Sequence, residues 1–296
     1  MCHHSNKNYI FVVNPISGGI DKDTIIESVE EFAQAGSINL TVYKTSGKDD
    51  ELEIKNLFEL HHFERAIIAG GDGTIKLVTE ALENTDIIYG ILPSGSANGL
   101  ARDLNLSDVL EENLQTAFHE NPTAIDIITI NGMKCLHLSD IGLNASLIKN
   151  YEEGTIRGKL GYALNTIKTL SENVEPLHAV IEYDQGRMET DAHVVIIANS
   201  QKYGTGVVIN PNGKIDDGKF EIVIFKNLDW LMVGKILLGN MPIEGTDIEI
   251  LSTDKARITT SVPVNFQMDG EYCEKVTELN IEILPKHIRI AIPQSE

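Results

Sequence analysis

Hydrophobic and polar positions follow two periods over the first 125 residues of the chain. Residues 9–13, YIFVV, form a short apolar run typical of a buried strand, and residues 24–35 place apolar side chains at helical spacing between acids. The same alternation predicts further strands at 40–43, 66–69 and 87–92, and helices at 49–60 and 75–83. Strands and helices that alternate in this way indicate a parallel sheet covered by helices.

The pattern changes from about residue 125 onward. Only residues 157–171 and about 228–239 look helical there, and Asn131-Gly132 is a strong hairpin signal. We therefore predict an α/β domain over 1–125, a mostly antiparallel β-domain over 126–284, and a tail over 285–296 that could return to the first domain. The short segments predicted as strands are 125–130, 134–140, 178–183, 192–198, 207–210, 220–225, 248–251, 255–259, 264–268 and 278–284.

Polar, flexible loops follow four predicted strands of the first domain, at residues 14–19, 45–48, 70–74 and 93–98. In parallel sheets, ligands bind beyond the carboxyl ends of the strands. Residues 69–74 read AGGDGT, and their glycines allow the backbone to approach a ligand closely. The helix expected to begin near Ile75 would direct its free N–H groups at an anion such as phosphate.

Asp72 is the unexpected residue of this loop. A carboxylate beside bound phosphates repels them unless it holds a hydrogen-bond donor, a water molecule or a cation. The combination indicates a nucleotide-phosphate site that works with a metal ion.

The net charge limits the classes of partner. The 296 residues carry a formal charge of −20, so nucleic acid is a poor partner. No run reaches the roughly 20 apolar residues of a transmembrane helix, and the first residues lack the apolar core of a signal peptide. Three cysteines without close pairing favour a reducing compartment, which we expect to be the cytoplasm.

Taken together, AGGDGT, the upstream NPISGG of residues 14–19 and the downstream LPSGSAN of residues 92–98 resemble the diacylglycerol kinase catalytic-domain family, which includes sphingosine and ceramide kinases. DIGLNA at 140–145, GKLGY at 158–162, DDGKF at 216–220 and VNFQMDGE at 264–271 resemble later motifs of the same family. The resemblance covers nearly the whole chain. It implies an ATP-binding α/β domain like that of NAD kinases and diacylglycerol kinases, followed by a β-sandwich domain.

The resemblance also implies roles for particular residues. ATP would lie between the two domains, with its phosphates against Asn14, Pro15, Ser17, Gly18, Thr45, Gly70, Gly71, Asp72, Gly73, Thr74 and Ser96. Glu271 would be the general base that accepts the proton of a lipid hydroxyl. Mg²⁺ would be held by Asp217 and by the main-chain carbonyls of Lys214 and Lys219, and Asp126 would join the metal–water network.

Each of these roles has a simpler structural alternative. Asn14 and Ser17 could only cap a turn, and Glu271 could be a solvated residue of a surface hairpin. Asp216-Asp217-Gly218 could be a plain type I turn, and Asp126 a solvated residue at the edge of a strand. Cys135 is most simply a core residue, and Cys2-His3-His4 a frayed terminus.

The leading function is an ATP- and Mg²⁺-dependent lipid kinase that meets diacylglycerol or a related lipid transiently at a membrane surface. Two alternatives remain: an NAD kinase, which shares GGDGT, and a catalytically degenerate sensor. Lys76 and Leu77 stand where many bacterial relatives have Asn-Glu, which motivates the sensor, and Glu80 could substitute for the missing carboxylate. Residues 229–238, with the single Trp230, would form a buried helix or a membrane-contacting surface. The sequence leaves homo-oligomerisation and the identity of the lipid open.

Overall fold

The structure is a computed structural model that describes residues 7–19, 21–142, 175–203, 207–227 and 247–294. The chain divides into two compact units. The first comprises Met1–Ile125 and Lys286–Glu296, and the second comprises Asp126–Pro285. The predicted boundaries at 125/126 and 284/285 lie within one residue of these divisions.

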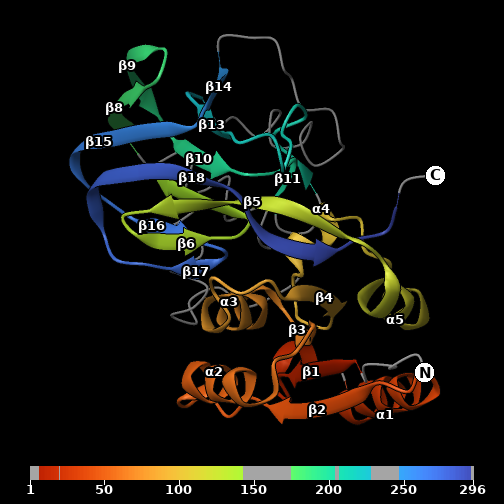
Figure 1. The fold of residues 1–296 in the computed structure, drawn as a ribbon. Helices are drawn as coiled ribbons and strands as arrows, with labels where there is room; N and C mark the ends of the chain where they lie inside the picture. Colours follow the sequence, from red (N-terminus) through yellow and green to blue (C-terminus); the bar gives the residue numbers. More distant parts are fainter. Residues whose placement is uncertain (1–6, 20, 143–174, 204–206, 228–246, 295–296) are drawn as a thin grey trace. The chain divides into compact units, whose positions relative to one another are not determined.

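The first unit is built on a parallel sheet. Its strands run in the order β2 (Asn39–Lys44), β1 (Asn8–Val13), β3 (Arg65–Gly70) and β4 (Ile88–Pro93), all parallel (Figure 1). The last residues of β18 (Val276–Ala291) add a further parallel strand, with Arg289 beside Ile88 and Ile290 beside Tyr89. Residues of the C-terminal tail thus complete the sheet of the first unit.

Helices cover both faces of this sheet. They are α1 (Lys22–Ala35), α2 (Asp50–His61), α3 (Asp72–Ala81), α4 (Gly99–Asp103) and α5 (Leu110–His119), with a 3₁₀ turn η1 at Ser17–Gly19. The chain moves in opposite directions along the sheet from β1 to β2 and from β2 to β3, so right-handed crossovers place α1 and α2 on opposite faces. Accordingly α1 contacts α5, and α2 contacts α3 (Figure 1).

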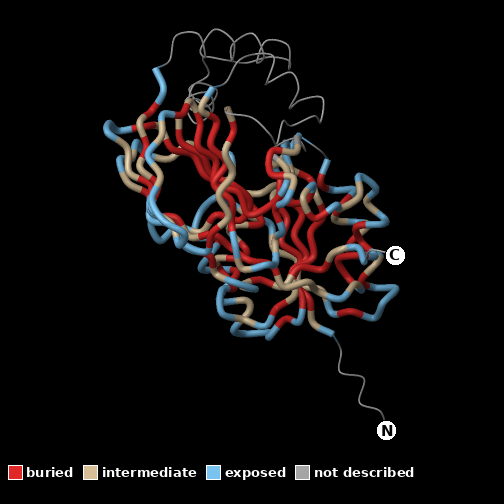
Figure 2. Tube along the Cα trace, turned by 90° about the horizontal axis from the view of Figure 1, so that it is seen from above, coloured by how far each residue is buried: buried red, intermediate tan, exposed pale blue. Residues whose placement is uncertain are grey.

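Burial explains why the strands of this sheet are continuously apolar. Every residue of β3 is buried, as are five of the six residues of β1. Figure 2 shows buried segments in red and exposed segments in pale blue. Parallel strands covered on both faces require apolar side chains at successive positions. On the α1–α5 face, the ring of Phe118 packs against those of Tyr9 and Phe32, at centroid distances of 5.6 and 5.0 Å.

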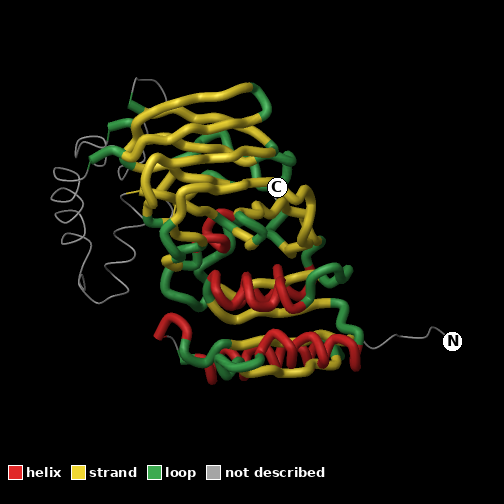
Figure 3. Tube along the Cα trace, turned by 90° about the vertical axis from the view of Figure 1, so that its left-hand side faces the viewer, coloured by secondary structure: helices red, strands yellow, loops and turns green. Residues whose placement is uncertain are grey.

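The described part of the second unit contains strands and no helix (Figure 3). One antiparallel sheet has the order β14 (Ile248–Thr253), β13 (Phe220–Phe225), β10 (Val194–Ala198), β7 (Leu138–Gly142), β16 (Phe266–Met268) and β17 (Glu271–Tyr272). In the other sheet, β18 lies between β15 (Lys255–Val264) and β5 (Pro122–Ile130); beyond these are β8 (Leu177–Tyr183), β9 (Gly186–Ala192) and β6 (Met133–Cys135). Strands β11 (Lys202–Tyr203) and β12 (Val207–Val208) form a separate two-stranded sheet.

Residues of both sheets form one apolar core. Ile141, Val195 and Phe220 of the first sheet cluster with Ile181 and Ile258 of the second. This is the packing of a β-sandwich, so the predicted fold class is confirmed for both parts of the chain. Cys135 is fully buried in the same core, as predicted.

Several details differ from the predicted elements. Helix α3 begins at Asp72 rather than near Ile75, and α4, α5 and β9 were not predicted. The segment predicted as one strand, 134–140, contains two, because the chain leaves one sheet after Cys135 and enters the other at Leu138. The Asn131-Gly132 hairpin is confirmed, with φ of 51° and 82° at its two turn residues. The predicted helices 157–171 and 228–239, Trp230 and the Cys2-His3-His4 segment lie outside the described residues.

Candidate functional site

The AGGDGT segment turns directly from β3 into α3. Gly71 is the single residue between them, and its carbonyl accepts hydrogen bonds from the backbone N–H groups of Thr74 and Ile75 at 2.9 and 3.1 Å. A Cβ on Gly70 would lie 2.4 Å from the Cβ of Thr74, so only glycine fits there. The first N–H groups of α3 lack partners within the helix and lie at the carboxyl end of the sheet, which suits phosphate.

The Asp72 carboxylate holds hydrogen-bond donors. It accepts from the backbone N–H of Gly99 at 2.9 Å and from that of Leu100 at 3.0 Å, which begin helix α4. A hydrogen-bond donor, a water molecule and a cation were considered as partners of this carboxylate, and the structure shows hydrogen-bond donors. Asp72 therefore caps α4 and ties the loop after β4 to the loop after β3.

Asn14 and Ser17 both cap their own turn and reach the neighbouring loops. Asn14 Oδ1 accepts from the backbone N–H of Ile16, and its Nδ2 donates to Thr74 Oγ1, both at 3.2 Å. Ser17 Oγ lies 3.2 Å from the carbonyl oxygens of both Asn14 and Ser94. Turn capping is thus confirmed for both side chains, which also link the first loop to Thr74 and Ser94.

The turn after Ser17 packs on the loop after β4. Gly18 has a φ of 62°, and a Cβ there would lie 2.5 Å from the carbonyl oxygen of Ser94. Lys22, the first residue of α1, is 5% exposed and donates from Nζ to the same carbonyl oxygen at 2.6 Å. Burial lowers the pKa of the Lys22 ammonium. Lys22 was not among the predicted site residues, although it stands only three residues after NPISGG.

The remaining loops are shaped by side chains of their own. Asn98 Oδ1 accepts from the backbone N–H of Gly95 at 2.8 Å, which leaves Ser96 exposed at the tip of the loop. The backbone N–H of Thr45 donates to the carbonyl oxygen of Val13, and Asp50 accepts from the N–H groups of Ser46 and Gly47 at 2.8 and 2.7 Å. Burial alone would raise the pKa of Asp50, but these two bonds and those from the Tyr43 and Ser46 hydroxyls together outweigh it and lower the pKa. Pro15 and Gly18 are exposed on the first loop.

All the residues predicted to bind ATP lie at the carboxyl edge of one sheet in the first unit, on the loops after its strands or where β3 turns into α3. Hydrogen bonds join the first loop to AGGDGT through Asn14 and Thr74, and to the last loop through Ser17, Lys22 and Ser94. The resulting cradle offers backbone N–H groups, small hydroxyls and a buried ammonium, which are the groups that bind phosphate oxygens.

The other predicted residues lie in the second unit. Glu271 is exposed and follows a turn in which Asp269 and Gly270 have φ of 52° and 86°. Asp126 is fully buried, so its interpretation as a solvated edge residue is wrong. Its Oδ2 accepts from the backbone N–H of Gly218 at 2.6 Å, and its own N–H donates to the carbonyl of Ile215.

Asp126 therefore fixes the loop that carries Lys214, Asp217 and Lys219. Asp217 is exposed, and its Oδ1 accepts from the backbone N–H of Lys219 at 3.1 Å. Among the described residues, no group of three or more His, Cys, Asp or Glu side chains could hold a metal ion. The Asp217 carboxylate and the carbonyl oxygens of Lys214 and Lys219 are hard oxygen donors, the kind of ligand that Mg²⁺ takes.

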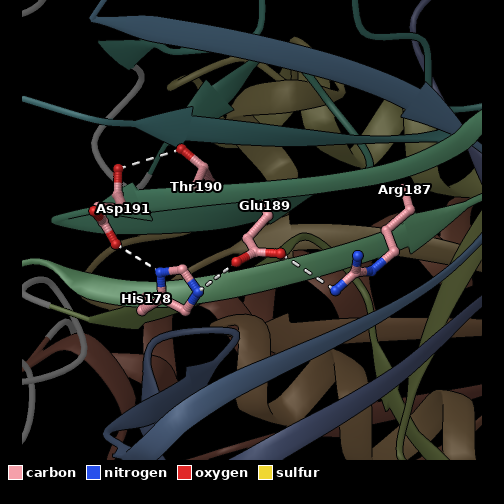
Figure 4. Close-up of polar contacts among 5 residues, drawn as sticks. All are labelled: His178, Arg187, Glu189, Thr190 and Asp191. Atoms are coloured by element: carbon pink, nitrogen blue, oxygen red, sulfur yellow. Dashed lines mark hydrogen bonds and ion pairs between the residues drawn. The ribbon is translucent and has the colours of Figure 1, made fainter.

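A separate polar cluster lies on the β8–β9 hairpin (Figure 4). His178 Nδ1 lies 2.7 Å from Asp191 Oδ1, and its Nε2 lies 3.3 Å from Glu189 Oε1. Glu189 also pairs with Arg187 at 3.3 Å. The hydrogen bond to Asp191 raises the pKa of His178. These side chains are solvent-exposed, so we interpret the cluster as a surface ion-pair network.

Comparison with known proteins agrees with this architecture. The diacylglycerol kinase catalytic domain family matches residues 8–130, and the YegS C-terminal NAD kinase beta sandwich-like domain matches residues 140–292. The chain therefore belongs to the family that combines a diacylglycerol kinase catalytic domain with a YegS-type C-terminal domain.

Individual relatives span the whole chain. It is 25% identical to the diacylglycerol kinase of Bacillus subtilis (strain 168) over 295 residues, covering 96% of each chain. It is also 25% identical to a probable lipid kinase YegS-like protein of Chromohalobacter salexigens, covering 99% of this chain and 95% of that one. A solved structure of a candidate diacylglycerol kinase from Bacillus anthracis str. Sterne superposes with a TM-score of 0.81 at 25% identity, covering 97% of each chain.

Family membership implies that the chain uses ATP. The loops of the first unit are consistent with that use. Among the described residues, no helix is long and apolar enough to cross a membrane.

Proposed function

We propose that this protein transfers the γ-phosphate of ATP to a hydroxyl group of a lipid, diacylglycerol or a related molecule. The observation that carries the proposal is the cradle formed by residues 14–19, Lys22, 70–74 and 94–98, in a chain that matches both a diacylglycerol kinase catalytic domain and a YegS-type C-terminal domain. Phosphoryl transfer depends mainly on positioning and charge neutralisation, and such a cradle supplies both.

The nucleotide phosphates bind at the backbone N–H groups of residues 70–74, with Asn14, Ser17, Thr45 and Ser96 as further polar contacts. Pro15 and Gly18 shape the first loop. Asp72 does not contact the phosphates in this proposal, because both its oxygens already accept backbone hydrogen bonds. Its contribution is to hold the loops at their spacing.

Glu271 is the general base. The lipid hydroxyl oxygen forms a bond to the γ-phosphorus while the bond from that phosphorus to the β–γ bridging oxygen breaks. The electron pair of the broken bond leaves with ADP, and the hydroxyl proton passes to the Glu271 carboxylate. Glu271 is exposed, as a group that must meet an external substrate has to be.

Mg²⁺ would be held by Asp217 and by the carbonyl oxygens of Lys214 and Lys219, and it would supply positive charge near the transferred group. Asp126 supports this loop from within, through its hydrogen bond to Gly218. Asp126 is therefore proposed as a positioning residue. The lipid is reached at a membrane surface by transient, peripheral contact.

The test measures ATP consumption with diacylglycerol, monoacylglycerol and sphingoid bases in detergent micelles, for wild type and for Glu271→Gln. We expect one of these lipids to be phosphorylated by wild type, with kcat lowered at least 100-fold in Glu271→Gln. If none is phosphorylated while NADP forms from NAD, the protein is an NAD kinase. Nucleotide binding without turnover of either acceptor would identify it as a sensor.

A further inference from the structure

Glu271 lies on a hairpin that is too short to fix its own geometry. Only two residue pairs join β16 and β17, Gln267 with Tyr272 and Met268 with Glu271. The turn between them, Asp269-Gly270, has both residues in the left-handed region. Isolated hairpins of this size are marginally stable in water, so other contacts must hold the turn.

The first of these contacts is a buried pair of polar side chains beneath the turn. Gln267 and Asp140 are both fully buried and lie side by side on strands β16 and β7. Gln267 Nε2 donates to Asp140 Oδ2, and Gln267 Oε1 accepts from the backbone N–H of Gly270 at 2.9 Å. Because Asp140 Oδ2 accepts from the amide nitrogen of Gln267, the amide oxygen of Gln267 is directed toward the N–H of Gly270.

The second contact ties the other turn residue to the segment between β6 and β7. The Asp269 carboxylate accepts from the backbone N–H groups of Leu136 and His137, at 3.1 and 2.9 Å. The N–H of Asp269 donates to the carbonyl oxygen of Leu138 at 2.8 Å. Hydrogen bonds therefore hold both turn residues, which immediately precede the proposed base Glu271 in the chain.

We propose that Asp140 and Gln267 are positioning residues, which fix the Asp269-Gly270 turn and thereby direct the Glu271 carboxylate. The inference rests on the proposed role of Glu271. A buried carboxylate and carboxamide contribute little to stability that an apolar pair of the same volume would not supply, because each must first lose its hydration. They do specify one geometry, and a misplacement of about 1 Å in a reacting group can cost about 100-fold in rate.

The test exchanges the two functional groups. Gln267→Glu alone places a second carboxylate against Asp140 and removes the bond between them. In the double variant Asp140→Asn, Gln267→Glu, the new amide donates to the new carboxylate, whose other oxygen still accepts from Gly270. We expect kcat of the single variant to fall about 100-fold with an unchanged KM for ATP, and the double variant to recover to within about threefold of wild type. Full activity of the single variant would overturn the proposal, and so would a folded double variant that stays as slow as the single one.

A second variant removes the risk that the charged substitutions fail to fold. Gln267→Met keeps the side-chain volume and loses both hydrogen bonds, and we expect kcat about tenfold lower with the same KM for ATP. Thr253→Val is the matched control, since Thr253 is also fully buried and bonds to Asp184, away from the turn. Equal kcat values in Gln267→Met and the control would contradict the proposal.

Glu271→Gln separates this inference from the proposed function. If that variant is as active as wild type, the base role fails and the positioning role fails with it. If Glu271→Gln is inactive while the Gln267 variants keep wild-type kcat, only the positioning inference is wrong.

Discussion

The carboxylate of Asp72 lies 2.9 Å from the backbone nitrogen of Gly99, and so the central residue of AGGDGT caps a helix that begins 27 positions later. The same carboxylate accepts from Leu100 at 3.0 Å. This relationship explains how an acid can stand in a loop that is proposed to bind phosphate. Its negative charge is directed at the N-terminus of α4, where two N–H groups and the helix dipole stabilise it.

Replacing Asp72 should therefore lower the stability of the protein, apart from any effect on catalysis. We expect Asp72→Ala to lower the free energy of unfolding by about 1–2 kcal/mol, because two N–H groups of α4 lose their acceptor. Asp72→Asn keeps one acceptor oxygen and should lose about half as much. Urea denaturation of the two variants measures both effects. An unfolding free energy of Asp72→Ala equal to that of wild type would disprove the capping role.

Close packing of the loop backbones predicts a second effect. A Cβ on Gly95 would lie 2.4 Å from the Cα of Gly71, so Gly95→Ala must push the last loop away from AGGDGT. We expect the variant to bind ATP at least tenfold more weakly, because the N–H groups proposed to bind the phosphates lose their arrangement. Isothermal titration with ATP measures the change.

Gly19→Ala is the control for this prediction. Gly19 lies on the first loop with a φ of 63°, and a Cβ there would meet nothing within 4 Å. Its substitution should cost only the backbone strain, about 1 kcal/mol of stability. A Gly95→Ala variant that binds ATP as tightly as Gly19→Ala would show that the two loops adjust freely.

The buried ammonium of Lys22 predicts a third effect. Lys22→Met keeps most of the side-chain volume and removes the hydrogen bond to the carbonyl of Ser94 and the positive charge beside the cradle. Because hydrogen bonds to charged groups contribute about 1.5–3 kcal/mol, we expect ATP to bind at least tenfold more weakly. Lys48→Met, at an exposed lysine of the second loop, should bind ATP about as well as wild type. Equal affinities of the two variants would show that Lys22 does not support the site.

The His178 cluster predicts a dependence of stability on pH. The bond to Asp191 raises the pKa of His178 in the folded protein above its ordinary value of about 6.5. The protonated histidine therefore stabilises the fold fully below about pH 6.5, and this contribution is lost as the pH rises through the higher folded value. Asp191, Glu189 and Arg187 are the charged groups with which the histidine and its partners pair.

Thermal denaturation of wild type and His178→Gln between pH 5.5 and 8.5 tests this. We expect the difference in Tm to be largest at pH 5.5 and to shrink toward pH 8.5. A difference that is constant with pH, or that grows at alkaline pH, would show that protonation of His178 does not stabilise the hairpin.

The period of the apolar residues predicted most elements of the first unit. Strand β1 and helix α1 were recognisable because a doubly covered strand is continuously apolar and a surface helix is apolar on one side only. Helix α5 had a similar signal in Leu110, Leu114, Ala117 and Phe118, although it was not predicted. Helix α4 had none, since its five residues form a helix only where Asp72 caps them.

The sequence by itself determined the order of the elements and the loops that carry the candidate site. It also determined the change, near residue 125, from alternating strands and helices to mostly strands. It could do so because periodicity, glycine and turn residues act through local backbone geometry. Only the tertiary structure decided the partners of the buried polar groups. Asp72 with Gly99, Lys22 with Ser94, Asp126 with Gly218 and Asp140 with Gln267 are between 27 and 127 positions apart. Such pairs form only when strands distant in the chain lie close together, and no local pattern records which donor will meet which acceptor.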